Sequence, residues 1–396
     1  MKIAILTVGN STDTGGIMSF VCEEARQFKK KESVGVISDV FMIRIKPSFI
    51  LQKALFVFSN KAILKSYYDE SPSDCIDGVI FHNIWVKENF LGFLTRTKIT
   101  HKSFTNKNTK IICSILKNYD YVITHKPQCH SIGRVLWEQY SIPFGAFWHG
   151  SELTINAFSS RESKVQAKKT LETAHDNFFV SEALLKLSDC ITENGRKKVI
   201  YTGPSDAFYR YTKEKKDELR ARFGLTSDTI VLAYVGHIID LKNVMELPQI
   251  YKCIKAKCQN KKMVFWVIGH GVLEESLNAA FEETSFPYKM FGNVPPSEMP
   301  DYMNCIDILL LISKNEGLGL VCLEALKCGA KVFGSKVGGI PEVIGASNCS
   351  PLDSSFVDNI STLITHYIQE EERNVTYDES FSWENAVNSI LRAIKE

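Results

Sequence analysis

Two glutamates flank a glycine-containing turn at the start of a predicted helix. Glu316 lies just before the turn at residues 317–320, and Glu324 lies on the second turn of the helix, which Gly329 closes in the left-handed conformation. Eight residues of helix span about 12 Å, whereas two carboxylates that act on one glycosidic bond lie about 5 to 9.5 Å apart. The spacing therefore predicts that the two carboxylates hold the two ends of one long ligand.

The turn between the glutamates predicts an anion site. Its backbone N–H groups are left free at the helix start and point outward, and the positive end of the helix dipole adds to their effect. These groups belong to Gly317, Leu318, Gly319 and Leu320. The order carboxylate, phosphate site, carboxylate fits a nucleotide sugar, with one acid for the sugar hydroxyls and the other for the ribose hydroxyls. The alternative is a capped surface helix with two solvated acids, and the glutamate pair alone does not decide between the two.

Length and composition predict a globular protein of two domains. The chain has 396 residues, of which 44% are apolar and 23% charged. The first apolar run, at residues 2–8, is too short for a secretory signal, and no run reaches the roughly 18 residues that span a bilayer. The eleven cysteines are scattered without C-x-x-C or Cys/His spacing, which predicts reduced thiols, no metal site and a cytoplasmic location.

The net charge of +2 hides an uneven distribution. Residues 1–200 carry 27 Lys and Arg against 19 Asp and Glu, and residues 201–396 carry 20 against 26. Between Arg44 and Arg134, basic residues interleave with Phe, Ile and Leu. These are Lys46, Lys53, Lys61, Lys65, Lys87, Arg96, Lys98, Lys102, Lys107, Lys110 and Lys117. Such a surface could hold the protein peripherally on an anionic membrane. The alternative is an ordinary solvated surface, and no motif supports nucleic-acid binding.

Apolar runs alternate with helical stretches, which predicts an α/β protein with two doubly wound parallel sheets. The first set of predicted strands is Ile3–Val8, Val34–Ser38, Gly78–Phe81, Tyr121–Thr124, Pro143–Trp148, Phe178–Val180 and Val199–Tyr201. The second set is Thr229–Val235, Val264–Ile268, Tyr288–Phe291, Ile306–Ile312 and Lys331–Phe333. We place the break between the sets in the charged stretch Tyr209–Phe223.

The two sets of strands predict two Rossmann-like domains, at residues 1–205 and 206–378. We expect an acceptor to bind to the first domain and a nucleotide sugar to the second. An amphipathic helix within residues 379–396 is expected to pack back on the first domain. In such folds ligands bind at the carboxyl ends of the strands, here in a cleft between the domains.

Three further loops follow predicted strands. The loop after the first strand contains Gly15 and Gly16, which allow a close approach of the backbone to a ligand, although the dinucleotide motif G-x-G-x-x-G is absent. His149 ends another strand and precedes a glycine, where either a functional or a structural role is possible. His237 and Lys242 follow the first strand of the second domain and are suited to phosphate; a solvated loop is the alternative reading for Lys242.

These segments together resemble the retaining glycosyltransferases of family 4, whose GT-B fold consists of two facing Rossmann-like domains. Glu316 and Glu324 stand where that family has its E-x7-E motif. The surrounding pattern is matched by Ser313, Gly317, Gly319, Leu320, Ala325, Gly329, Gly338, Gly339, Pro341 and Glu342. The resemblance extends over nearly the whole chain and is strongest at residues 288–344.

The resemblance implies transfer of a sugar from a nucleotide-sugar donor with retention of anomeric configuration and without a cofactor or an essential metal. It assigns catalytic roles to His149, Glu316 and Lys242. Glu316 and His149 would contact the donor sugar, Lys242 the diphosphate, and Glu324 the ribose hydroxyls. The implied donor-binding residues are Gly15, Gly16, His237, Lys242, Gly292, Val294, Glu316, Gly317, Leu318, Gly319, Leu320 and Glu324.

Four positions depart from the family pattern. The family usually has arginine where this chain has His237, glycine at Asn243 and Asn-Gly at Thr202-Gly203, and phenylalanine is more common at Leu318. The change at position 237 bears on diphosphate binding, because histidine is smaller than arginine and only partly charged at neutral pH.

The sequence thus predicts an enzyme, a retaining hexosyltransferase that moves a sugar from a UDP- or GDP-sugar to a glycan or lipid-linked acceptor in surface polysaccharide biosynthesis. Two alternatives stay open at this point. One is a nucleotide-sugar epimerase of the same fold, and the other is a non-catalytic subunit of a glycan-assembly complex.

Overall fold

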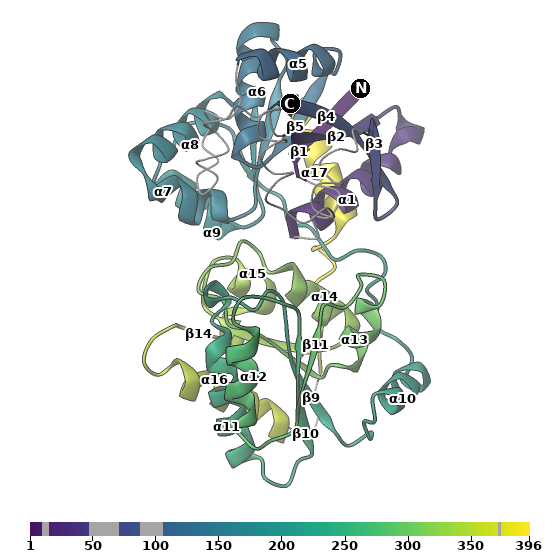
Figure 1. Ribbon diagram of the computed structural model, residues 1–396, viewed down its shortest axis with the longest axis vertical. Helices are drawn as coiled ribbons and strands as arrows, with labels where there is room; N and C mark the ends of the chain where they lie inside the picture. Colours follow the sequence, from purple (N-terminus) through teal and green to yellow (C-terminus); the bar gives the residue numbers. More distant parts are fainter. Residues whose placement is uncertain (10–15, 47–70, 88–105, 371–373) are drawn as a thin grey trace, which may run out of the picture. The chain divides into compact units, whose positions relative to one another are not determined.

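The computed structural model describes residues 1–9, 16–46, 71–87, 106–370 and 374–396. The chain divides into two compact units (Figure 1). Unit 1 comprises residues 1–179, 185–200 and 386–396, and unit 2 comprises residues 180–184 and 201–385. The boundary between the units in this region is thus at residues 200/201, a few residues before the 205/206 boundary expected from the sequence.

Unit 1 is built on an eight-stranded sheet with the order β3-β4-β2-β1-β5-β6-β7-β8. The strands are β1 (Lys2–Val8), β2 (Ile37–Lys46), β3 (Ser73–Ile76), β4 (Val79–Lys87), β5 (Tyr121–His125), β6 (Phe144–Trp148), β7 (Asp176–Phe179) and β8 (Lys197–Val199). All neighbours pair in parallel except β3 and β4. The strand order reverses between β1 and β5, so the crevice expected for a ligand lies beyond the carboxyl ends of these two strands.

The helical segments of the first half of the chain connect these strands. They are α1 (Gly16–Lys29), η1 (Glu32–Val34), α5 (Asn106–Leu116), α6 (Pro127–Tyr140), the π-helix η3 (Glu152–Asn156), α7 (Ala157–Ser159), α8 (Arg161–Thr173) and α9 (Glu182–Asp189). The carboxy-terminal helix α17 (Trp383–Lys395) has its residues 386–395 in unit 1.

One predicted strand of this unit was misplaced, and one strand was not predicted. The predicted strand Val34–Ser38 begins later, because residues 32–34 form a 3₁₀ turn that Gly35 ends in the left-handed conformation. The short antiparallel strand β3 was missed. Its turn to β4 consists of Asp77 and Gly78, both with positive φ, and this dipeptide is a typical hairpin signal.

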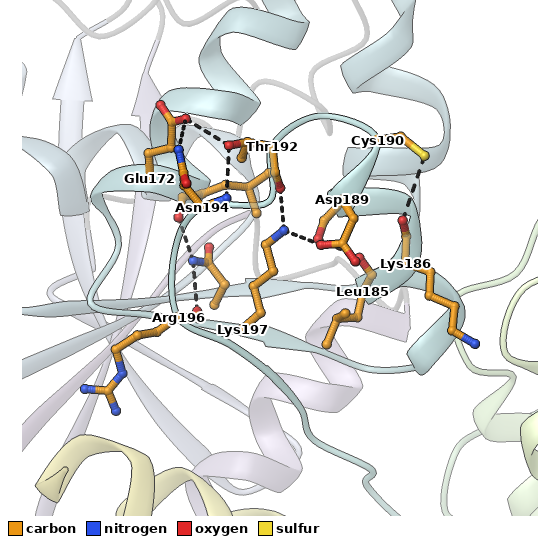
Figure 2. Close-up of polar contacts among 12 residues, drawn as sticks. Glu172, Leu185, Lys186, Asp189, Cys190, Thr192, Asn194, Arg196 and Lys197 are labelled. Carbon is orange, nitrogen blue, oxygen red and sulfur yellow. Dashed lines mark hydrogen bonds and ion pairs between the residues drawn. The ribbon is translucent and has the colours of Figure 1, made fainter.

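Polar contacts fix the segment that joins α8, α9 and β8 (Figure 2). The Lys197 ammonium group donates to Asp189 Oδ1 at 2.6 Å and to the carbonyl oxygen of Thr192. The Thr192 hydroxyl in turn donates to Glu172 Oε1 at 2.9 Å. These bonds close the turn after α9 onto the end of α8.

Unit 2 is built on a six-stranded, fully parallel sheet with the order β11-β10-β9-β12-β13-β14. The strands are β9 (Ile230–Val235), β10 (Met263–Ile268), β11 (Tyr288–Gly292), β12 (Ile308–Leu311), β13 (Lys331–Ser335) and β14 (Cys349–Ser350). The order reverses between β9 and β12, and the loops that follow these two strands therefore meet at the expected ligand crevice of this unit.

Helices cover both faces of the sheet of unit 2 (Figure 1). They are α10 (Lys213–Arg222), η4 (Asp240–Lys242), η5 (Val244–Glu246), α11 (Leu247–Lys257), α12 (Glu274–Glu282), α13 (Met299–Cys305), α14 (Leu320–Cys328), α15 (Ile340–Ile344), η6 (Ala346–Asn348) and α16 (Phe356–Gln369). The main apolar core joins the strands to α11, α12 and α16. Each large side chain fully buried there stabilises the unit by about 1.5–3 kcal/mol.

The charged stretch that the sequence suggested as the break is a helix of unit 2. Its buried Arg220 donates to Asp307 Oδ2 and to the carbonyl oxygen of Cys305, both at 3.0 Å. This contact attaches α10 to the end of the sheet where β9 and β12 begin, opposite the crevice. No helix in the described part of the chain is long and apolar enough to cross a membrane.

Candidate functional site

Lys242 and Glu316 meet at the point where the strand order of unit 2 reverses. Lys242 ends the 3₁₀ turn after β9, and Glu316 lies in the loop after β12. The Lys242 ammonium group donates to Glu316 Oε2 at 2.7 Å, and the buried Ser313 hydroxyl donates to the same oxygen at 3.2 Å. The side chains of the ion pair are 21% and 17% exposed, so a ligand in the crevice would contact both.

The loop after Glu316 presents backbone N–H groups at the start of α14. Gly319 precedes the helix with φ +88° and without a side-chain cap. Among the described residues, no hydrogen-bond partner is seen for the backbone N–H groups of residues 317–320. Free N–H groups, the helix dipole and a lysine next to them form a suitable site for phosphate.

A second glycine loop lies directly behind this one. A Cβ atom on Gly338 would lie 1.9 Å from the carbonyl oxygen of Glu316, and one on Gly339 would lie 2.5 Å from that of Gly317. The Gly339 N–H group also donates to the Gly317 carbonyl oxygen at 3.1 Å. Only residues without a side chain fit here, so the Gly-Gly pair fixes the backbone that carries Glu316.

The loop after β9 places His237 at the surface beside this crevice. His237 is exposed, and its carbonyl oxygen accepts a hydrogen bond from the buried Tyr234 hydroxyl at 2.7 Å. A Cβ atom on Gly269, at the end of β10, would lie 2.0 Å from the carbonyl oxygen of Gly236. The loops after β9 and β10 are therefore packed backbone against backbone, and the side chain of His237 lies at the surface.

The remaining predicted donor-binding residues of unit 2 follow β11 in the same loop layer. Gly292 ends β11 with φ +65°, and its carbonyl oxygen accepts the N–H group of Gly269 at 2.8 Å. Val294, two positions on, is partly exposed. Both residues lie at the carboxyl end of the sheet, and the donor-binding role that the resemblance implies for them stays a prediction.

Glu324 is an acid in a poorly solvated position. It lies on α14, is only partly exposed, and has no hydrogen-bond partner among the described residues. Burial raises the pKa of its carboxyl group to about 8. An unpartnered acceptor of this kind fits ribose hydroxyls, which would satisfy it.

Glu324→Gln is expected to stabilise the ligand-free protein at alkaline pH. The folded-state pKa of about 8 exceeds the value of about 4.3 in an unfolded chain. The folded state therefore holds more protons than the unfolded state between these values, and wild-type stability falls as pH rises through that window. The variant should have a higher melting temperature than wild type at pH 8.5 and an equal one near pH 4.5.

The control is Glu218→Gln, on the exposed face of α10. If the melting temperatures of Glu324→Gln and wild type differ by the same amount at both pH values, the result would contradict the burial of the Glu324 carboxylate.

One of the departures from the family pattern has a structural explanation. Asn243 adopts the left-handed conformation with φ +55°, which asparagine tolerates better than most residues, so it replaces the usual glycine. In the Thr202-Gly203 pair only Thr202 departs; Gly203 keeps the family's glycine and has no room for a Cβ atom, which would lie 2.4 Å from the carbonyl oxygen of Phe381.

Glu342, which the sequence matched to the family without a role, has a structural one. Its carboxylate accepts the N–H groups of Glu182 and Ala183 at 2.9 and 2.8 Å and the Tyr201 hydroxyl at 2.7 Å. It therefore caps the start of α9.

His149 of unit 1 lies in a cluster of rings at the carboxyl end of its sheet. The ring of Phe147 stacks on His149 at 5.2 Å, and Phe20 of α1 meets it edge-on at 4.6 Å. His149 Nε2 lies 2.9 Å from His125 Nδ1. Burial and the neighbouring His125, His130 and Lys126 hold the pKa of His149 well below its usual value, so this imidazole is neutral at physiological pH.

A cavity of about 610 Å³ opens beside this cluster in unit 1. Trp148, Lys126, Gln128 and Glu152 are among its lining residues. Glu152 is buried and accepts the N–H group of Gly150 at 2.9 Å, and burial raises the pKa of its carboxyl group. An aromatic ring together with amide and carboxyl groups is a suitable lining for a sugar.

Several predicted residues lie outside the described part of the chain. Gly15 is one of them; Gly16 is described, begins α1 and is exposed. Lys53, Lys61, Lys65, Arg96, Lys98 and Lys102 also lie outside it, so the proposed basic surface stays a prediction. No group of three or more metal-binding side chains occurs among the residues that the structure describes.

Two polar residues near His149 were not predicted from the sequence. His125 ends β5, and the completely buried Glu24 of α1 contacts it. A histidine directly after the apolar run Tyr121–Thr124 was an available signal for the first. No local pattern marks Glu24, because it is one of two adjacent glutamates on α1 that are both buried, Glu23 and Glu24.

Comparisons with known proteins agree with this architecture. Residues 215–394 match the model of the family "Glycosyl transferases group 1". The chain is 25% identical over 243 residues to TuaC of Bacillus subtilis, a candidate glycosyltransferase of teichuronic acid biosynthesis, covering 60% of this chain and 58% of TuaC. It is also 25% identical over 205 residues to the lipopolysaccharide 1,2-N-acetylglucosaminetransferase of Salmonella typhimurium, covering 47% of this chain and 53% of that protein. The matches thus span little more than half the length of these relatives.

A solved structure shows the same fold over the whole chain. Alr3699/HepE of Anabaena, in complex with UDP and glucose, has a TM-score of 0.71 at 15% identity and covers 100% of this chain and 99% of that one. The predicted GT-B fold class is confirmed. The similarity to the glycosyl transferases group 1 covers residues 215–394, somewhat less than half of the chain.

Proposed function

We propose that the protein is a retaining glycosyltransferase that moves a sugar from a UDP- or GDP-sugar to a glycan or lipid-linked acceptor. The observation that carries this proposal is the meeting of Lys242 and Glu316 beside the free N–H groups of residues 317–320. The group 1 family and the relatives named for teichuronic acid and lipopolysaccharide synthesis support it, and they favour surface polysaccharide as the product. The UDP complex of the structural relative supports a nucleotide donor.

In this proposal the diphosphate of the donor lies against Lys242 and the start of α14. Negative charge grows on the diphosphate as the glycosidic bond breaks, and positively charged groups and N–H dipoles that are already in place stabilise it. Lys242, His237 and the helix start would supply this charge, so the proposed reaction uses no metal. Glu316 would be released from Lys242 by the phosphates and would accept hydrogen bonds from the sugar.

Retention of configuration is proposed to follow from attack on the same face of the sugar as the leaving group. Glu316 and Glu324, about 12 Å apart along the chain, are too far apart to act as a nucleophile and acid pair on one bond. The departing phosphate oxygen would then take the proton of the acceptor hydroxyl. We propose that the acceptor binds to unit 1, where the cavity beside His149 offers an aromatic ring, amide and carboxyl groups.

A thermal-shift screen against UDP, GDP, ADP and their sugars tests the nucleotide part of the proposal. A nucleotide present at 100 times its dissociation constant stabilises the protein by about 2.7 kcal/mol. Glu324→Ala should weaken the best nucleotide about 10- to 150-fold at pH 8.5, where the carboxyl group is largely ionised and its charge-assisted hydrogen bonds to ribose are worth about 1.5–3 kcal/mol. Calorimetric titration measures this loss, with Glu218→Ala as the control on α10.

Absence of any shift across the screen would argue for the non-catalytic alternative. Conversion of the donor to its epimer without release of nucleoside diphosphate would argue for the epimerase. Full nucleotide affinity in Glu324→Ala would remove this residue from the ribose site.

A further inference from the structure

Glu24, His125 and His149 form a continuous hydrogen-bonded chain in unit 1. Glu24 lies on α1, His125 ends β5, and His149 follows β6. Glu24 Oε2 lies 2.9 Å from His125 Nε2, and His125 Nδ1 lies 2.9 Å from His149 Nε2. Because α1 follows β1 and β1 pairs with β5, this chain of hydrogen bonds begins at the point where the strand order of unit 1 reverses.

The first two members of the chain are enclosed in protein. The side chains of Glu24 and His125 are both 0% exposed. Glu24 Oε1 has no hydrogen-bond partner in the described structure, and the nearby Arg26 pairs with Glu23 instead. Phe147 stacks on the ring of His125 at 5.4 Å. His125 is therefore the group that balances the charge of Glu24.

The burial of this pair determines its protonation. An ionised Glu24 beside a neutral His125 would leave one negative charge without compensation in the interior, which costs several kcal/mol. One additional proton makes the pair neutral overall, whether that proton lies nearer the carboxylate or the imidazole. Glu24 Oε1 has no acceptor for a proton among the described residues, so this proton lies between Oε2 and Nε2. In either position there, His125 Nδ1 carries a hydrogen and donates it to His149 Nε2.

The second ring nitrogen of His149 then has a defined role. His149 is neutral, because burial and the neighbouring His125, His130 and Lys126 hold its pKa well below the usual value. Since its Nε2 accepts the hydrogen bond from His125, its single ring proton lies on Nδ1. No hydrogen-bond partner of Nδ1 is seen among the described residues, and His149 is partly exposed.

We propose that Glu24 and His125 are positioning residues that hold His149 in the neutral Nδ1–H form, so that its ring offers a hydrogen-bond donor to an oxygen atom of the bound sugar or phosphate. The identity of the ligand in this inference rests on the proposed function, whereas the protonation state of the His149 ring does not. A donor at this position suits an ether, phosphate or carbonyl oxygen, which the opposite tautomer would repel.

The state of the ring is tested on the ligand-free protein by NMR. Protein labelled with ¹⁵N at histidine is examined at pH 7.5 in a spectrum that correlates ring carbon-bound protons with both ring nitrogens. His149→Gln identifies the signals of His149. We expect a protonated Nδ1 and an unprotonated Nε2; a protonated Nε2, or protons on both nitrogens, would overturn the proposal whether or not the protein binds a nucleotide sugar.

The double variant Glu24→Leu/His125→Phe tests the origin of this state. It replaces both polar groups by apolar ones of similar size, a change that buried ion pairs often tolerate. His149 should then lose its fixed tautomer, and turnover of the donor found in the thermal-shift screen should fall about tenfold, the value of one hydrogen bond, with nucleotide affinity unchanged. Unchanged His149 signals in a folded double variant would show that the pair is only structural.

A matched control is available in the same layer. Thr124 Oγ1 and His130 Nδ1 are also a buried pair at 2.9 Å, and Thr124→Val/His130→Phe makes the same kind of replacement without breaking a bond to His149. It should leave the tautomer of His149 as in wild type. If the first double variant fails to fold, the wild-type spectrum alone decides the proposal.

Discussion

Replacing Glu316 with glutamine is expected to lower turnover of the sugar donor about 10- to 100-fold, with nucleotide affinity nearly unchanged. The carboxylate lies where β9 and β12 diverge and is held by Lys242 at 2.7 Å and Ser313 at 3.2 Å. Hydrogen bonds to a charged group are worth about 1.5–3 kcal/mol, and in this proposal Glu316 makes them to the reacting sugar. Release of nucleoside diphosphate from the donor measures turnover, and calorimetry with the free nucleotide measures affinity.

The control for Glu316 is Glu218→Gln, which lies on the exposed surface of α10. It should retain wild-type turnover and affinity. An equal loss of free-nucleotide affinity in Glu316→Gln and Glu324→Ala would contradict the division between a sugar-binding and a ribose-binding glutamate.

Gly338→Ala is expected to reduce turnover about 100-fold without unfolding the protein. The new Cβ atom would lie 1.9 Å from the Glu316 carbonyl oxygen, so one of the two loops must move by about 1 Å. A displacement of that size at a reacting group costs about 100-fold. The donor assay and the melting temperature are measured on the same preparation.

Gly224→Ala separates this displacement from ordinary backbone strain. Gly224 also has a positive φ, of +73°, and lies in the same unit, but no atom lies within 4 Å of its Cβ position. Both variants should therefore lose about 1–2 kcal/mol of stability from the left-handed conformation. Only Gly338→Ala should lose turnover, and equal activities would show that the Gly-Gly pair does not position Glu316.

Much of unit 2 could be predicted from the sequence because its signals are local. The helix that begins at Leu320 and ends at Gly329 was recognised from its glycines and its apolar spacing, and the structure has both ends in place. The apolar runs that became β9, β10 and β11 stood out for the same reason. In contrast, the charged residues of α10 suggested a linker, since the buried contact between Arg220 and Asp307 spans 87 positions and leaves no local pattern.

Prediction from local sequence patterns has the same limit for the residues of the site. The sequence indicated Lys242 and Glu316 separately, and only the parallel pairing of β9 with β12 shows that they touch. The chain from Glu24 to His149 joins α1, β5 and β6, and its members are up to 125 positions apart. Charge patterns along the chain do not reveal which of the two neighbouring buried glutamates on α1 contacts His125, because the fold around them decides that.

The configuration of the released sugar tests the proposed chemistry most directly. The protein is incubated with an α-linked nucleotide sugar that gives turnover, and the anomeric proton of the first sugar released or transferred is followed by ¹H NMR before mutarotation. An α product accompanied by an equal amount of nucleoside diphosphate is expected for same-face substitution at the Lys242 and Glu316 site. A β product would contradict the proposal of a retaining glycosyltransferase.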